Sequence, residues 1–108
     1  MNFTINGEKW YITEVPQERF VDNEDGERLY FGQTHYDTGQ IWLYRDLNWD
    51  KKRKTLYHEL MHVYIKTFIT SSDMKFDEEL LCDISANAHD VVQDIAERYF
   101  SQKIVDIT

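Results

Sequence analysis

The chain has 108 residues, a formal net charge of −8 and a sequence pI of about 4.8. This length is typical of one domain, and we expect a single domain over residues 1–108. The hydrophobic share of 42% and the aromatic share of 15% predict a folded globule and exclude a disordered acidic chain. The negative charge disfavours nucleic-acid binding as the main role, because a phosphate backbone requires a positive surface.

The cysteine content and the hydropathy predict a cytoplasmic protein with no membrane partner. Cys82 is the one cysteine, which excludes an intrachain disulfide and fits a reducing compartment. The first eight residues lack a basic segment followed by an apolar core, so no signal peptide is predicted. No apolar run approaches the roughly 20 residues that a membrane-spanning helix needs.

The first half of the sequence predicts a small antiparallel sheet of three strands. Aromatic and β-branched residues indicate strands at 10–15, 29–36 and 41–44, and Pro16 ends the first of them. A short helical turn is expected at 17–23, a turn at 23–26, and a tight connection at 37–40.

The second half predicts two long helices, at 49–68 and 77–100, separated by a break at 70–73. Asn48 or Asp50 is expected to cap the first helix. Leu56, Leu60, Val63 and Thr67 line one side of that helix, and His58, His62, Ile65 and Ile69 line a nearly opposite side. The first helix should therefore be packed on two sides, with its histidines largely buried. The predicted fold class is α+β, a three-stranded antiparallel sheet packed on two long helices.

The first helix carries the sequence His58-Glu59-Leu60-Met61-His62, which has the form H-E-x-x-H. Residues four apart lie on the same face of a helix, so both imidazoles can meet one metal ion. In zinc hydrolases with this spacing, the two histidines are ligands and the glutamate is the general base. The pattern therefore predicts a Zn²⁺ site with His58 and His62 as ligands and Glu59 as the catalytic base. The alternative is a buried helix with two structural histidines.

A catalytic zinc ion has three protein ligands and one open position for water. Three residues after the motif can supply the third donor, namely Glu79, Asp83 and His89. For the two carboxylates the alternative is an acidic helix start, which the helix macrodipole favours. The basic run at 51–54 is interpreted as the solvated start of the first helix, and a contact with an acidic peptide or with DNA is the alternative.

Residues 79–83 read E-x-x-x-D, which resembles the pattern of thermolysin-like gluzincin peptidases. This resemblance implies Glu79 as the third zinc ligand and Asp83 as a residue that supports a ligand histidine by a hydrogen bond. The segment 41–83 is also similar to small H-E-x-x-H proteins of prophages and mobile elements, related to the ImmA/IrrE metallopeptidases. Residues 83–87 have the E-x-x-A-N form of those relatives with Asp in place of Glu, and on that alignment Asp83 is the ligand. The resemblance implies a minimal zincin-like domain.

The predicted function is zinc-dependent hydrolysis of a peptide bond in a protein or peptide substrate. Zinc-bound water would be the nucleophile, and His35 or Tyr36 would donate a hydrogen bond to the transition state. An exposed edge strand made of Ile41, Trp42, Leu43 and Tyr44 would align the substrate by main-chain pairing. The alternatives are a catalytically inactive, metal-stabilised regulatory or protein-binding module, and a metal-free accessory protein with an acidic surface.

Overall fold

The computed structural model describes residues 1–20, 29–68 and 78–107, and it excludes the side chains at 68, 78–87 and 103–107. Four strands, β1 (Asn2–Ile5), β2 (Glu8–Val15), β3 (Gly32–His35) and β4 (Gln40–Tyr44), precede two helices, α1 (Trp49–Phe68) and α2 (Glu78–Ile107). A 3-10 turn, Gln17–Arg19, follows β2. The predicted turn at 23–26 and the predicted helix break at 70–73 lie outside the described residues.

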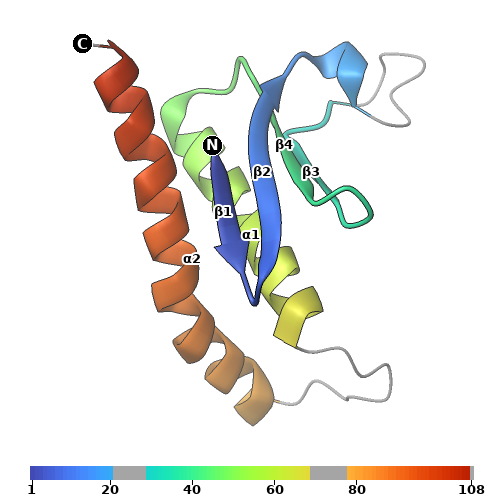
Figure 1. The fold of residues 1–108 in the computed structure, drawn as a ribbon, viewed down its shortest axis with the longest axis vertical. Helices are drawn as coiled ribbons and strands as arrows, with labels where there is room; N and C mark the ends of the chain where they lie inside the picture. The colour runs from blue at the N-terminus through green and yellow to red at the C-terminus, as the bar shows by residue number, and fades with distance from the viewer. Residues whose placement is uncertain (21–28, 69–77, 108) are drawn as a thin grey trace.

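The sheet has four strands in the order β1-β2-β4-β3 (Figure 1). The β1–β2 and β3–β4 pairs are antiparallel, whereas β2 and β4 are parallel and align Ile12 with Ile41. The prediction of three antiparallel strands was therefore wrong in strand number and in this pairing. The α+β class and the two long helices agree with the prediction.

The strand that was not predicted, β1, forms a hairpin with β2 through Asn6 and Gly7. Both residues have positive φ angles, 50° and 79°, which is the backbone conformation that a two-residue hairpin turn requires. Phe3 and Ile5 alternate with exposed residues along β1 and enter the core. The Asn-Gly pair was the sequence signal for this hairpin.

The core lies between one face of the sheet and the two helices. Leu56, Leu60 and Val63 of α1 are at most 2% exposed and pack against Ile41 and Leu43 of β4, which are fully buried. Figure 1 shows α1 behind the sheet and α2 running alongside α1. Neither helix, over its described residues, is long and apolar enough to cross a membrane.

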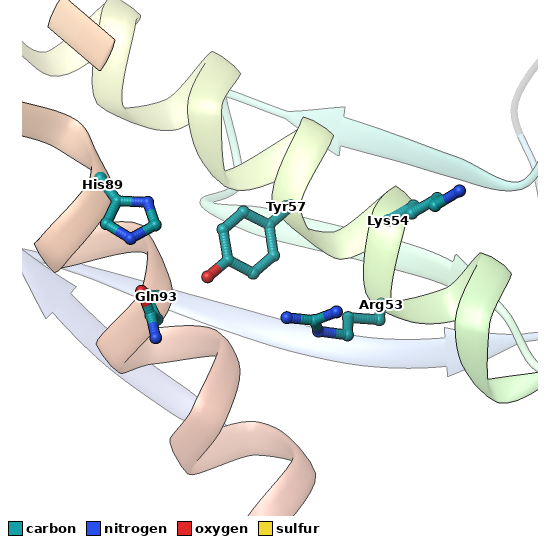
Figure 2. Close-up of a pocket in the computed structure, with 5 residues that line it drawn as sticks. All are labelled: Arg53, Lys54, Tyr57, His89 and Gln93. Atoms are coloured by element: carbon teal, nitrogen blue, oxygen red, sulfur yellow. The ribbon is translucent and has the colours of Figure 1, made fainter. Parts of the chain in front are cut away.

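The α1 helix begins where the sequence predicts. The side-chain oxygen Oδ1 of Asn48 accepts a hydrogen bond from the backbone N–H of Lys51 at 2.9 Å, as a helix cap does. The second helix, α2, packs along α1 and extends beyond the predicted end at residue 100. A hollow lies between the two helices, as Figure 2 shows.

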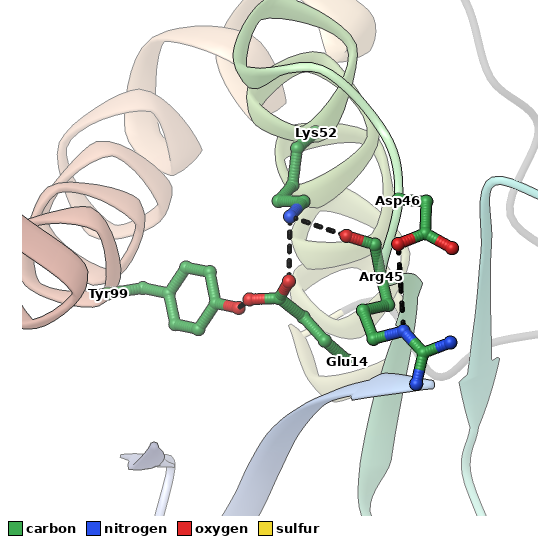
Figure 3. Close-up of polar contacts among 5 residues, drawn as sticks. All are labelled: Glu14, Arg45, Asp46, Lys52 and Tyr99. Carbon is green, nitrogen blue, oxygen red and sulfur yellow. Dashed lines mark hydrogen bonds and ion pairs between the residues drawn. The ribbon is translucent and has the colours of Figure 1, made fainter. Parts of the chain in front are cut away.

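A buried polar cluster joins the sheet to both helices (Figure 3). The ammonium Nζ of Lys52 in α1 lies 2.6 Å from Oε1 of Glu14 in β2 and donates to the backbone oxygen of Arg45 at 3.1 Å. The hydroxyl of Tyr99 in α2 donates to the other oxygen of Glu14. Lys52 is only 8% exposed, so the expectation that the whole basic run is solvated was wrong at this residue.

Candidate metal centre and catalytic base

The two motif histidines lie one helical turn apart on α1 and point their rings at each other. Their Nε2 atoms are 3.1 Å apart, and the ring planes meet at 84°. Two tetrahedral zinc–nitrogen bonds of about 2.05 Å would place their nitrogens about 3.3 Å apart. The observed spacing differs from this value by about 0.2 Å. The imidazole pair therefore fits two ligands of one metal ion without a change of backbone.

Both histidines are exposed, contrary to the prediction that they are largely buried. Successive helical residues are about 100° apart, so His58 and His62 lie far round the helix from the buried stripe of Leu56, Leu60 and Val63. Among the described residues, no element packs over the two rings. An exposed pair of imidazoles leaves room for a further ligand and for solvent.

Glu59 lies on the side of α1 that faces the sheet and is 8% exposed. Its oxygen Oε2 accepts a hydrogen bond of 2.5 Å from the hydroxyl Oγ1 of Thr34 in β3. This bond fixes the carboxylate while the neighbouring imidazoles face outward. A buried, oriented carboxylate beside two exposed imidazoles is the arrangement that a general base next to a metal ion requires.

Gly32 of β3 allows this strand to approach α1 closely. A Cβ atom at this position would lie 2.7 Å from Cγ2 of Thr55 and 3.3 Å from Cγ of Glu59. Any side chain here would therefore push β3 away from the carboxylate of Glu59. Neither Gly32 nor Thr34 was predicted as a site residue, although an isolated glycine inside a strand pattern often marks such a close approach.

An open hollow of about 400 Å³ adjoins the motif, and we call it the motif hollow. Leu29 and Phe31, which precede β3, are 61% and 39% exposed and form its apolar rim. The hollow is lined by residues before β3, by β3 itself and by one side of α1: Leu29, Tyr30, Phe31, Gly32, Lys54, Thr55, His58 and Glu59. It can accept an apolar side chain next to Glu59.

The two predicted hydrogen-bond donors lie on different faces of the sheet. The ring of His35 contacts Trp42 with a centroid distance of 4.3 Å, on the face opposite to Thr34 and Glu59. His35 therefore does not face Glu59, and its predicted role as a donor was wrong. The pKa of Tyr36 is raised by burial and by the negative charge of Glu59.

The predicted edge strand is an inner strand. The segment Gln40–Tyr44 pairs with β2 on one side and with β3 on the other, and Ile41 and Leu43 are fully buried. Ile41, Trp42, Leu43 and Tyr44 therefore cannot align an extended substrate. Among the described strands, β3 is the edge strand beside α1, and one side of its backbone has no strand partner.

The two carboxylates predicted as the third ligand, Glu79 and Asp83, belong to α2, and their side chains lie outside the described residues. Among the described side chains, no group of three His, Cys, Asp or Glu residues is arranged to hold a metal ion. The described part of the centre therefore consists of His58, His62 and Glu59.

Comparisons of the chain with protein-family models, with curated proteins and with solved structures found no match.

Proposed function

We propose that the chain is a zinc-dependent peptidase that hydrolyses a peptide bond in another protein. The observation that carries this proposal is the 3.1 Å approach of the two Nε2 atoms beside a carboxylate that Thr34 orients. His58 and His62 would hold the metal with Glu79 as the third ligand, and Asp83 is the alternative third ligand. Two neutral nitrogen ligands and one carboxylate make zinc the preferred ion.

Zinc held by His58, His62 and a third ligand would lower the pKa of a bound water molecule and polarise the scissile carbonyl. Glu59 accepts the proton of the attacking water on Oε1, because Oε2 is engaged by Thr34. The same carboxylate then passes this proton to the nitrogen of the leaving amine, which restores Glu59 for the next cycle. A tyrosine hydroxyl keeps its proton at neutral pH. Burial and Glu59 raise the pKa of Tyr36 further, so its hydroxyl can donate to the developing oxyanion.

The backbone of β3 supports the binding of an extended substrate. Among the described strands, β3 pairs only with β4 and forms the sheet edge beside α1, and Gly32 keeps that edge close to Glu59. A peptide that paired with this edge as an additional strand would pass along the motif hollow. An exposed, shallow surface of this kind suits a segment of another protein better than a small molecule.

The zinc content of purified variants tests the metal centre. We expect one zinc ion per chain in the wild type and in Glu59→Gln, and loss of zinc in His58→Ala and His62→Ala. Glu79→Gln should lose zinc and Asp83→Asn should retain most of it, and the reverse result would make Asp83 the third ligand. His89→Ala should retain zinc, because His89 lines the hollow between α1 and α2 and not the motif hollow. Zinc loss in this variant would make His89 the third ligand. Equal zinc loss in Glu59→Gln and His58→Ala would contradict the assigned roles.

Cleavage of a mixed peptide library tests the activity. We expect hydrolysis by the zinc-loaded wild type, inhibition by a chelator, recovery on zinc addition, and no hydrolysis by Glu59→Gln. Zinc binding at both histidines without any cleavage would refute the peptidase and favour a metal-stabilised binding module.

A further inference from the structure

A second hollow of about 480 Å³ lies between α1 and α2, and we call it the interhelix hollow. Among the described side chains, five residues of the two helices line it: Arg53, Lys54, Tyr57, His89 and Gln93 (Figure 2). Arginine, lysine and histidine can each carry a positive charge, and none of the five residues is acidic. This basic lining occurs in a chain with a formal net charge of −8. It therefore favours a negatively charged ligand.

Arg53 lies within cation–π range of two aromatic rings of the same helix. Its guanidinium carbon lies 5.8 Å from the ring centroid of Trp49 and 5.9 Å from that of Tyr57. Among the described residues, Arg53 makes no ion pair. The planar guanidinium group presents its N–H donors as a fork that suits bidentate binding of a carboxylate.

The hydroxyl of Tyr57 adds a neutral donor to the same hollow. In Figure 2 this hydroxyl points towards the part of α2 that carries His89 and Gln93. Burial and Glu97 raise the pKa of Tyr57, although the positive charge of Arg53 lowers it, so the hydroxyl keeps its proton at neutral pH.

The nearby acidic residue Glu97 lies in the adjoining hollow, not in the interhelix hollow. That smaller hollow, of about 340 Å³, shares Arg53 and Tyr57 with the interhelix hollow and also contains the apolar rings of Trp49 and Phe100. The Glu97 carboxylate accepts a hydrogen bond from Nε2 of Gln93 at 2.9 Å. A negatively charged ligand group should therefore lie in the interhelix hollow, away from Glu97. An apolar residue next to that group in the ligand can contact the rings of Trp49 and Phe100.

Lys54 lines both the interhelix hollow and the motif hollow that contains His58 and Glu59. The two hollows therefore adjoin each other across one side chain of α1. Arg53 precedes His58 by five residues, which corresponds to about 7.5 Å along the helix axis. An extended peptide advances about 3.3 Å per residue, so about two to four residues can bridge the two positions.

We propose that the interhelix hollow binds the carboxylate of an acidic residue in the protein segment that the peptidase cleaves, about two to four residues from the scissile bond. This assignment of substrate class rests on the proposed function. A nucleic-acid phosphate offers similar chemistry, but the excess of negative charge on this chain opposes a polyanion. An acidic side chain within a mainly apolar peptide is the ligand that both the charge and the aromatic rings favour.

A binding experiment tests the hollow without catalysis. Zinc-loaded Glu59→Gln protein is titrated with acetyl-Ala-Phe-Ala-Glu-Phe-Ala-amide, with the same peptide containing Gln in place of Glu, and with inorganic phosphate. The readout is the NMR signal of the Trp49 indole N–H. We expect the Glu peptide to bind at least about tenfold more tightly than the Gln peptide, as a charge-assisted bidentate contact allows.

Addition of Arg53→Gln should abolish the preference for the Glu peptide, and addition of Arg98→Gln should not change it. Arg98 is the matched control, because it is an exposed arginine that pairs with Asp94 on α2, outside the hollow. Equal binding of the two peptides, or an unchanged preference in Arg53→Gln, would overturn the proposal. Binding of phosphate as tight as that of the Glu peptide would assign the hollow to free anions and would also overturn it.

A cleavage experiment separates this inference from the proposed function. In a library of proteome-derived peptides, the wild type should cleave sequences enriched in Asp or Glu at one position near the cut. The Arg53→Glu variant should instead cleave sequences enriched in Lys or Arg at the same position. Cleavage without an acidic preference would overturn the inference and leave the peptidase standing. Absence of any cleavage would refute the peptidase and the substrate role together, and the binding experiment would then decide whether the hollow takes an acidic peptide.

Discussion

Replacement of Thr34 by valine isolates the hydrogen bond that orients the carboxylate of Glu59. Valine keeps the branched shape of threonine and suits a strand, so the main loss is the 2.5 Å bond from Oγ1 to Oε2 of Glu59. A hydrogen bond to a charged group contributes about 1.5–3 kcal/mol. Glu59 is 8% exposed, so little water can replace the Thr34 hydroxyl as its hydrogen-bond donor. Because the adjoining motif hollow is open, some water can still reach the carboxylate, which lowers the expected loss. We therefore expect a loss of about 1–2 kcal/mol in the free energy of unfolding.

A double-mutant cycle measures this interaction directly. Thr34→Val, Glu59→Met and the double variant are unfolded in urea at pH 7, in the presence of a chelator so that zinc does not contribute. We expect a coupling energy of about 1–2 kcal/mol between the two residues. Thr34→Ser keeps the hydroxyl and should show a much smaller effect than Thr34→Val. A coupling energy below about 0.3 kcal/mol would refute the reasoning, because it would mean that solvent replaces the bond.

Three further variants test the packing, the buried cluster and the helix cap. Gly32→Ala should lower the free energy of unfolding in urea by about 1–3 kcal/mol, because its Cβ would lie 2.7 Å from Cγ2 of Thr55. Thr55→Ser, added to Gly32→Ala, removes that methyl group and should restore part of the loss. Burial and Glu14 raise the pKa of Tyr99 above its ordinary value of 10.0, so an unfolded Tyr99 loses its proton first as the pH rises. Stability should therefore fall above pH 10 by up to about 1.4 kcal/mol per pH unit, and Tyr99→Phe should reduce this slope; an unchanged slope would contradict the assignment. Asn48→Ala should cost about 1 kcal/mol and lower the thermal midpoint by about 5 °C, and an unchanged midpoint would show that the cap is not needed.

Local sequence determined the helix that carries the motif and the approach of its two histidines. Asn48 supplies the cap, no glycine or proline interrupts 49–68, and the four-residue spacing places His58 and His62 on one face. These features depend only on residues within about one helical turn of each other, so the sequence alone predicts them. The hairpin through Asn6 and Gly7 also has a local signal, the Asn-Gly pair, although it was not predicted.

Tertiary structure decided which strand borders the carboxylate of Glu59 and how exposed the two motif histidines are. The segment Gln40–Tyr44 has the composition of a strand whether it lies inside a sheet or at its edge, and only its parallel pairing with β2 makes it an inner strand. The contact of Thr34 with Glu59 joins residues 25 positions apart, and no local pattern indicates such a pair. Strand order and long-range contacts arise from packing the whole chain around one core, so they became visible only in three dimensions.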